Sequence, residues 1–171
     1  MELYRDEIIQ RLLQIDNDMT LLDNTADTYD CVIVGGSALV LLKKIYRSTH
    51  DIDSINASDE IKPLLEAYNI NMNVRAYVMN FPDDYRDRII KVDIPTTKVN
   101  FYTVSLEDIV VSKLCSMREK DAEDIENELV YKDLNWTLMD KLIEDVCYGM
   151  FSDHSVNLLK INYENYKERF Q

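Results

Sequence analysis

The sequence predicts an α/β (α+β) protein, in which a mixed β-sheet is flanked by helices and followed by a helical C-terminal tail. Short apolar runs typical of strands alternate with helical segments up to about residue 104, and only helical periodicity follows. The 171 residues contain three glycines and three prolines, which indicates long regular elements with short connections. Hydrophobic residues make up 46% of the chain, enough to bury a core.

The first 70 residues predict two strands and three helices. Residues 3–22 carry an apolar stripe at helical spacing, and residues 30–34 form a short apolar strand that ends at two glycines. Ser37 is the predicted cap of an apolar helix over residues 38–45. Residues 51–55 alternate polar and apolar as a strand does, and residues 59–68 follow as a helix that Ser58 can cap.

Three more strands and a series of helices are predicted in the rest of the chain. The strands are expected at residues 73–79, 88–94 and 99–104. Ser105 with Asp108 three residues later is typical of a helix start. The predicted helices cover residues 106–118, 120–131, 136–149 and 155–168. Because no repeat, low-complexity run or flexible linker occurs, we expect one domain over residues 1–171.

Charge and composition narrow the function classes. The formal net charge is −13, so the chain repels a phosphate backbone unless it has a local basic patch, and it suits divalent cations or a basic protein partner. The three cysteines are far apart and indicate neither a disulfide framework nor a structural zinc site. No secretion signal or membrane-spanning run is found, so we expect a cytoplasmic protein with no membrane contact.

One ordered combination of residues carries chemistry. A strand, the turn Gly35-Gly36-Ser37 and a helix start make a cradle for an anion, since glycine lets the backbone approach phosphate and the free N–H groups favour negative charge. Asp51 and Asp53, two apart on the next strand, point to the same face and can hold one or two Mg²⁺ ions. Each part alone is common, since a second Asp-x-Asp occurs at residues 16–18, and the specificity lies in the order of the parts.

That combination resembles the DNA polymerase beta-like nucleotidyltransferase superfamily, whose signature is Gly-(Gly/Ser)-Ser followed by Asp-x-Asp. Residues 35–39 and 47–53 are more narrowly similar to its bacterial toxin-like branch, the abortive-infection AbiEii-type nucleotidyltransferases. The later segments Asp108–Leu114 and Arg118–Ile125 are similar to further motifs of that branch. The resemblance implies a minimal nucleotidyltransferase fold with its core at about residues 30–125 and a helical C-terminal part at about 126–171.

The resemblance also implies roles for individual residues. Gly35, Gly36 and Ser37 would contact the triphosphate of an NTP, and Asp51 and Asp53 would bind Mg²⁺ or Mn²⁺. Lys113 would pair with phosphate. Arg47 and Thr49 are further candidates for nucleotide binding, although Arg47 is equally interpretable as a structural partner of Asp51.

Two residues compete for the role of a third catalytic acid. In polymerase-like geometry Asp93 would lie on a strand next to residues 51–55, with its side chain on the same face. In toxin-like geometry Asp121 would act instead, by orienting Lys113 or the acceptor. The resemblance of the segment around Asp121 to the toxin branch favours Asp121, while the charged residues around it are also typical of a solvated helix face.

Two functions follow from these features. The first is an enzyme that transfers a nucleoside monophosphate from an NTP to an acceptor hydroxyl, and the resemblance suggests tRNA as one acceptor, with protein or a small molecule as the others. The second is a non-catalytic module of the same fold that acts through an antitoxin-like protein partner. The intact cradle and Asp-x-Asp pair favour the enzyme, whereas the short chain and the uncertain third acid favour the module.

Overall fold

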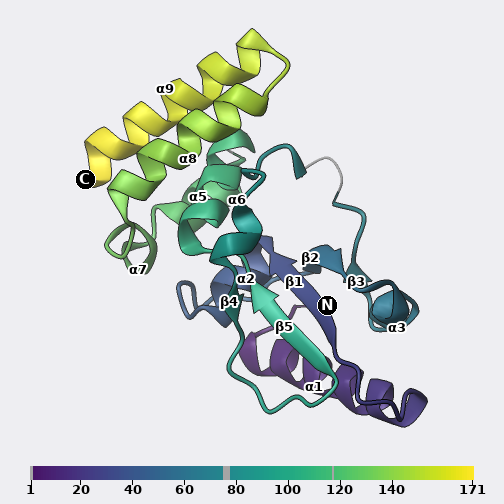
Figure 1. Ribbon diagram of the computed structural model, residues 1–171. Coiled ribbons are helices and arrows are strands. Elements are labelled where there is room, and N and C mark those ends of the chain that lie inside the picture. Colours follow the sequence, from purple (N-terminus) through teal and green to yellow (C-terminus); the bar gives the residue numbers. More distant parts are fainter. Residues whose placement is uncertain (1, 75–77, 117) are drawn as a thin grey trace. The chain divides into compact units, whose positions relative to one another are not determined.

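The computed structural model describes residues 2–74, 78–116 and 118–171 (Figure 1). The chain forms two compact units, of which unit 1 comprises Met1–Val74 with Ile89–Val104, and unit 2 comprises Arg75–Arg88 with Ser105–Gln171. The first unit holds the sheet and the second is helical. The expectation of one domain over residues 1–171 stays a prediction.

Unit 1 is built on a five-stranded mixed sheet in the order β3-β2-β1-β5-β4. The strands are β1 (Tyr29–Val34), β2 (Ile52–Ala57), β3 (Ile70–Asn71), β4 (Ile90–Lys91) and β5 (Val99–Thr103). The central strand β1 pairs antiparallel with β2 and parallel with β5. The two strands predicted at residues 30–34 and 51–55 therefore lie side by side in one mixed sheet.

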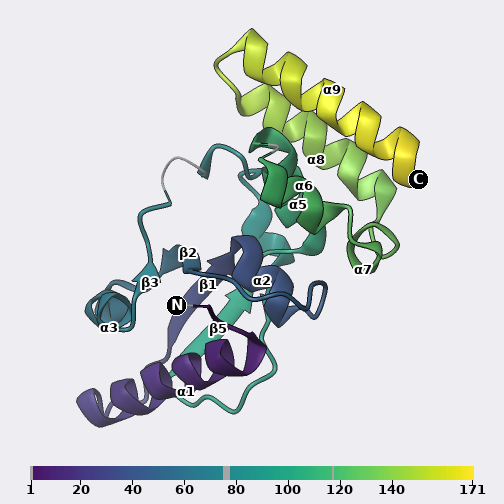
Figure 2. The same cartoon turned by 180° about the vertical axis from the view of Figure 1, so that it is seen from behind.

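Two helices cover one face of this sheet. They are α1 (Arg5–Leu22), which contacts β5, and α2 (Gly35–Leu41), which contacts β1 and β2, and the two helices also contact each other (Figure 2). The buried residues of α1 recur at Ile8, Leu12 and Ile15, the spacing of one helix face. The short elements η1 (Asp59–Ile61) and α3 (Lys62–Ala67) connect β2 to β3.

Unit 2 is helical. It contains η2 (Tyr85–Arg88), α5 (Leu106–Ser116), α6 (Glu119–Ile125), α7 (Glu128–Tyr131), α8 (Trp136–Gly149) and α9 (Asp153–Phe170). The helix α5 contacts α6, α8 and α9, and the last two form a hairpin (Figure 1). Ser105 caps α5 as expected, since its Oγ accepts the backbone N–H of Asp108 at 3.1 Å. In the part of the chain that is described, no helix is long and apolar enough to cross a membrane.

Several predicted elements differ from the observed ones. The third strand is Ile70–Asn71 and not residues 73–79, of which residues 75–77 lie outside the described chain. Asn69 has a φ of 55° and ends the preceding helix in a left-handed turn, so the chain extends three residues earlier than expected. The predicted helix over residues 120–131 is divided, because the Asn127 side chain caps a new helix by accepting the N–H of Leu129.

Of the two predicted caps, Ser37 is wrong, whereas Ser58 occupies the N-cap position of η1 as predicted. Neither Ser37 nor Ser58 makes a side-chain cap bond at its helix, because the hydroxyl of each is used elsewhere. The Ser37 Oγ donates to the carbonyl of Val34 at 3.0 Å, and the Ser58 Oγ accepts the backbone N–H of Asp30 at 3.0 Å. Helix α2 therefore begins at Gly35, with Val34 in the cap position.

Candidate functional site

The turn between β1 and α2 lies directly against the second aspartate of the Asp-x-Asp pair. In the β1–β2 register Val34 lies opposite Asp53, so the two glycines follow at the point where β2 carries that carboxylate. A Cβ placed on Gly35 would lie 3.4 Å from the Asp53 Oδ2. Gly35 has a φ of 69°, which favours glycine, so the backbone conformation and the close approach require the same residue.

The other side of the turn faces the segment that precedes the aspartates. A Cβ placed on Gly36 would lie 3.4 Å from an Nη atom of Arg47 and 3.5 Å from the Oγ1 of Thr49. Thr49 is buried and donates from Oγ1 to the carbonyl of Asp51 at 3.2 Å. Arg47 is half-buried and donates to the carbonyl of Ser48 at 2.7 Å. Both glycines are therefore approached by side chains that the sequence singled out.

The two aspartates differ in their surroundings. Asp51 is exposed and lies immediately before β2, while Asp53 is the second residue of that strand and is half-buried. Between and after them, Ile52 and Ser54 turn into the core. Because side chains alternate along a strand, both carboxylates belong to the face opposite those buried residues.

Asn71 is a site residue that the sequence reasoning missed. It lies on β3 in register with Asp53, and its Nδ2 donates to the Asp53 Oδ1 at 2.7 Å. That hydrogen bond fixes the orientation of the carboxylate and leaves Oδ2 toward the glycine turn. The alternation of Asn69, Asn71 and Asn73 with Ile70 and Met72 was the available signal, since a period of two with polar residues on one face is typical of a half-buried strand.

The Asp51–Asp53 pair fits a magnesium ion that is completed by its substrate. Among residues 2–74, 78–116 and 118–171, no three His, Cys, Asp or Glu side chains gather in a way that would hold a metal ion. Mg²⁺ is usually bound through one or two carboxylates together with substrate phosphates and water, and not by an all-protein cage. Asp53, beside the glycine turn, and Asp51, which immediately precedes the same strand, make a donor set of that kind.

Asp93 does not lie where polymerase-like geometry expects it. It is an exposed residue beyond the end of β4, and β1 and β5 separate β4 from β2. The strand ends early because the backbone N–H of Ile94 bonds back to Val92 at 3.0 Å, immediately before Pro95. The predicted neighbouring strand for the Asp93 carboxylate is therefore wrong.

Lys113 and Asp121 meet in unit 2, in a buried ion cluster. The Lys113 Nζ donates to Asp121 at 2.6 Å and to Asp124 at 2.9 Å, and all three side chains are at most 8% exposed. Asp121 also accepts the Ser116 hydroxyl at 2.6 Å and the Arg118 Nε at 2.7 Å. Burial by itself raises the pKa of Asp121, but these donors outweigh it and lower the pKa to about 2.

The contacts of Lys113 bear on two roles that the sequence suggested, the pairing of Lys113 with phosphate and the orienting of Lys113 by Asp121. An acid that orients Lys113 is expected to touch its ammonium, as Asp121 does. The ammonium is also compensated by two carboxylates, so Lys113 is not presented to a phosphate in this arrangement. Asp124 is the second carboxylate. From the sequence it was a candidate only as part of the segment Arg118–Ile125, with no role of its own.

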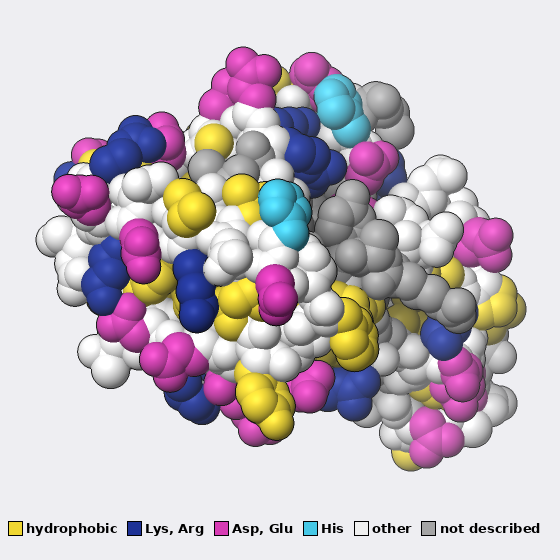
Figure 3. All heavy atoms as spheres, turned by 90° about the horizontal axis from the view of Figure 1, so that it is seen from above, with side chains coloured by type: hydrophobic (Ala, Val, Ile, Leu, Met, Phe, Trp, Pro, Cys, Tyr) yellow, Lys and Arg dark blue, Asp and Glu magenta, His cyan; other side chains and the backbone are white. Residues whose placement is uncertain are grey.

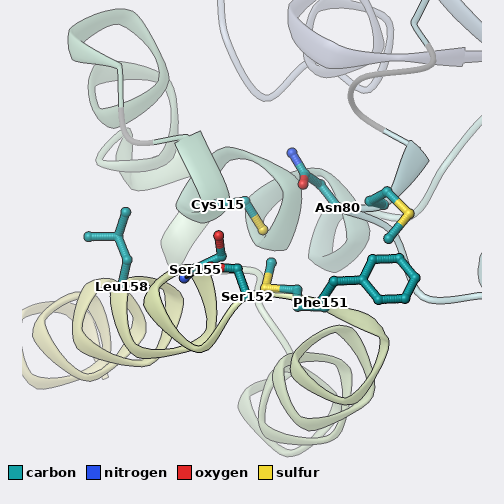
Figure 4. Close-up of a pocket in the computed structure, with 8 residues that line it drawn as sticks. Asn80, Cys115, Phe151, Ser152, Ser155 and Leu158 are labelled. Carbon is teal, nitrogen blue, oxygen red and sulfur yellow. Dashed lines mark hydrogen bonds between the residues drawn. The ribbon is translucent and has the colours of Figure 1, made fainter.

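A hollow of about 280 Å³ in unit 2 lies apart from these residues (Figure 4). Cys115 of α5 and Leu158 of α9 line it together with Phe151. Burial raises the pKa of the Cys115 thiol to about 12, with Cys147 adding to the effect, so the thiol is not activated as a nucleophile. Its lining includes none of the predicted site residues that the structure describes.

Comparison with known protein families gives one match. The model of a family described as a nucleotidyltransferase of unknown function (DUF6036) matches residues 10–171. No curated protein and no solved structure matches the chain.

Proposed function

The chain belongs to the DUF6036 family of nucleotidyltransferases, and from this premise we propose that it transfers a nucleoside monophosphate from an NTP to an acceptor hydroxyl, with Mg²⁺ held by Asp51 and Asp53. The observation that carries the proposal is the approach of the Asp53 carboxylate to Gly35, at 3.4 Å from the position of a Cβ. A nucleotide phosphate that lies on the glycine turn therefore lies beside a carboxylate that can share its metal ion.

The backbone and the neighbouring side chains supply the phosphate contacts. The first N–H groups of a helix have no partner within the helix, and the N-cap residue of α2, Val34, makes no side-chain cap bond. Arg47 brings its guanidinium to within 3.4 Å of the Cβ position of Gly36, where it can compensate phosphate charge. The Ser37 hydroxyl donates to Val34, so we assign the phosphate contact of this residue to its N–H group.

The proposed reaction is a single displacement. The acceptor oxygen forms a bond to the α-phosphorus, and the bond from that phosphorus to the bridging oxygen breaks. Pyrophosphate leaves with the bonding electron pair, and the hydroxyl proton passes to water. When bound, Mg²⁺ neutralises phosphate charge and aligns the reacting oxygens. Asp51 and Asp53 hold the ion, Asn71 holds Asp53, and catalysis rests on positioning and charge.

We assign to Asp121 the positioning of the Lys113 ammonium, and not the transfer of a proton. A carboxylate with a pKa of about 2 that accepts three hydrogen bonds is a poor base at neutral pH. Asp93 remains a candidate acid because it is exposed. The single variants Asp93→Asn and Asp121→Asn, assayed for transfer after their folding is checked by circular dichroism, separate the two.

The test of the proposed function is label transfer. The protein is incubated with each α-labelled NTP, Mg²⁺ and either total cellular RNA or total protein, and the wild type is expected to transfer label from at least one NTP. Asp51→Asn combined with Asp53→Asn removes the metal site and is expected to reduce transfer at least 100-fold, because both carboxylates that hold the ion are lost. Asp59→Asn, at an exposed carboxylate of η1, is the matched control. Transfer that persists in the double variant contradicts the proposal.

A non-catalytic nucleotide-binding module that acts through a protein partner, as in a toxin–antitoxin pair, is the second candidate. The compensation of Lys113 by two buried carboxylates favours it, because an enzyme would keep that cation for phosphate. This candidate predicts nucleotide binding without transfer of label to any acceptor.

A further inference from the structure

A second hollow of about 190 Å³ lies in unit 1 and is lined by basic side chains, although the chain as a whole is acidic. Arg5 comes from the first turn of α1, and Lys43 and Arg47 come from the segment after α2. Asp6 is the one carboxylate among its lining residues in the described chain. A local basic patch is the feature that a chain with a net charge of −13 needs in order to hold a phosphate.

The hollow is joined to the glycine turn through the backbone and through a shared side chain. Leu3 and Thr49 form an isolated antiparallel bridge, in which the N–H of each donates to the carbonyl of the other at 2.7 and 2.9 Å. The bridge brings the start of α1 beside the segment that faces Gly36. Arg47 lines the hollow and also reaches the Cβ position of Gly36, so the hollow adjoins the proposed NTP site.

Two of the three cations show features that their own packing does not explain. The Arg5 Nε is buried and has no hydrogen-bond partner within the described part of the chain. Lys43 has a φ of 60°, in the left-handed region that normally favours glycine. It occupies the position after the α2 C-cap, where the N–H groups of Lys43 and Lys44 bond back to Val40 and Leu39. A lysine in a conformation that favours glycine points to a use for its charge.

Two tyrosines add flat apolar surface at the same place. Tyr4 and Tyr46 line the hollow and are 51% and 78% exposed, while Val40 and Ile45 beneath are buried. Exposed aromatic rings next to cations are how proteins hold unpaired nucleotides, since the ring stacks on the base and the cations contact the phosphate.

We propose that this hollow binds a nucleotide unit of the acceptor, its phosphate on Arg5, Lys43 and Arg47 and its base on Tyr46. The inference rests on the proposed function and selects among its acceptors, because a protein side chain would use neither the three cations nor the exposed rings. The sources of such a unit are a free nucleotide and the 3′ end of an RNA strand.

The test is a binding measurement with two probes, a fluorescent single-stranded hexaribonucleotide with a free 3′-hydroxyl and unlabelled AMP as competitor. Lys43→Gly is expected to weaken RNA affinity about fivefold at 0.1 M salt. The negative slope of log K against log salt is expected to become smaller in magnitude by about 0.7, the effect of losing one phosphate contact. Tyr46→Ala is expected to weaken affinity about tenfold with the slope unchanged, because stacking carries no charge. Lys160→Ala, at an exposed lysine of α9, is the matched control and leaves both quantities unchanged.

The outcomes separate a free nucleotide from the end of an RNA strand. They also separate a failure of this inference from a failure of the proposed function. Competition by AMP supports a free nucleotide as the source, and RNA binding that AMP does not displace supports a strand end. Equal affinity of wild type, Lys43→Gly and Tyr46→Ala overturns the inference. A Mg²⁺–NTP thermal shift lost in Lys43→Gly also overturns it, because the hollow would then belong to the NTP site. Absence of that shift in the wild type contradicts the proposed function, while the RNA measurements still decide whether the hollow binds nucleotides.

Discussion

At the scale of single residues, the two glycines of the turn differ in what a side chain would meet. Gly35 combines a positive φ with close approach to the Asp53 carboxylate, whereas Gly36 has ordinary backbone geometry and faces Arg47 and Thr49 at contact distance. A methyl group at the first position therefore strains the fold, and at the second it enters the proposed phosphate site.

Alanine at each glycine tests this difference. Gly35→Ala is expected to lower the free energy of unfolding by about 1–2 kcal/mol, because an L-residue resists the left-handed conformation. Gly36→Ala is expected to change stability by less than about 1 kcal/mol, since alanine suits a helix better than glycine does. It is nevertheless expected to abolish the thermal shift with NTP. Urea unfolding and thermal shifts measure both quantities, and a strong NTP shift in Gly36→Ala would contradict the assignment of the turn.

The Lys113 cluster is a second feature at this scale. The folded-state pKa of Asp121, about 2, is lower than the ordinary aspartate value of 3.8. The stabilisation from its ionised form is therefore present above about pH 4 and is lost as the pH falls toward 2.

Lys113→Met removes the ammonium that two buried carboxylates share, and Asp121 keeps only its bond to Arg118 among its charged partners. We expect a loss of about 3 kcal/mol in the free energy of unfolding at pH 7, because removing one partner of a buried ion pair leaves charge uncompensated. The loss should shrink as the pH falls from about 4 toward 2, since the ionised form of Asp121 that Lys113 stabilises is then lost. Urea unfolding at several pH values measures this, and a loss that does not change with pH would contradict the ion cluster.

The sequence predicted the residues at the glycine turn better than the residues that hold them. Gly35, Gly36, Arg47, Thr49 and Asp53 were named from a local motif, and they come together because β1, α2 and β2 are consecutive. The contribution of Asn71 depends on which strand pairs with β2, and that pairing is decided by tertiary packing. The same limit applies to Asp93, whose strand was placed beside the wrong neighbour.

At the scale of whole elements, α1 holds the start of β5 through one carboxylate. Asp16 is 3% exposed and accepts the backbone N–H groups of Thr97, Lys98 and Val99 at 2.7–3.0 Å. These donors lie at the start of the strand, and those of the buried residues Lys98 and Val99 would otherwise lack partners. Asp16 belongs to the other Asp-x-Asp of the sequence, so a chance recurrence of the motif has a structural role.

Asp16→Ala removes the acceptor of three backbone donors. The free energy of unfolding is expected to fall by about 2–4 kcal/mol, because each buried N–H that loses its partner costs part of its desolvation free energy. Asp18→Ala is the matched control, since Asp18 accepts one hydrogen bond, from the Tyr68 hydroxyl at 2.7 Å. Urea unfolding measures the free energy of unfolding of both variants. Equal losses would show that the hydrogen bonds from the start of β5 to Asp16 do not stabilise the fold.

The long helices and the central strands were predictable because each has its own hydrophobic period. The two-residue strands were not, since β3 and β4 exist because a neighbouring strand offers partners, and the alternation around Asn71 does not show which strand that is. Arg88 was expected in a strand, but its guanidinium pairs with Asp84 and Asp108 in unit 2, at 2.8 and 2.9 Å, so the strand begins only at Ile90.

At the scale of the molecule, the face drawn in Figure 3 carries Asp and Glu side chains interspersed with Lys and Arg. The net charge of −13 opposes a long polyanion, and it is compatible with one nucleotide whose charge is shared with Mg²⁺. The basic hollow in unit 1 involves three cations, Arg5, Lys43 and Arg47, so it leaves that balance unchanged.

The central claim is a joint nucleotide and metal site at the glycine turn, and the measurement that tests it most directly is the melting temperature with and without Mg²⁺ and an NTP. A ligand that binds only the folded state at 100 times its Kd adds about 2.7 kcal/mol, which corresponds to a rise of about 5–10 °C for a chain of this size. We expect that rise with Mg²⁺–NTP in the wild type and none in the Asp51→Asn, Asp53→Asn double variant, whose own melting temperature is expected to be equal or higher because like charges are removed. An equal rise in the double variant would show that the nucleotide binds elsewhere and would contradict the account.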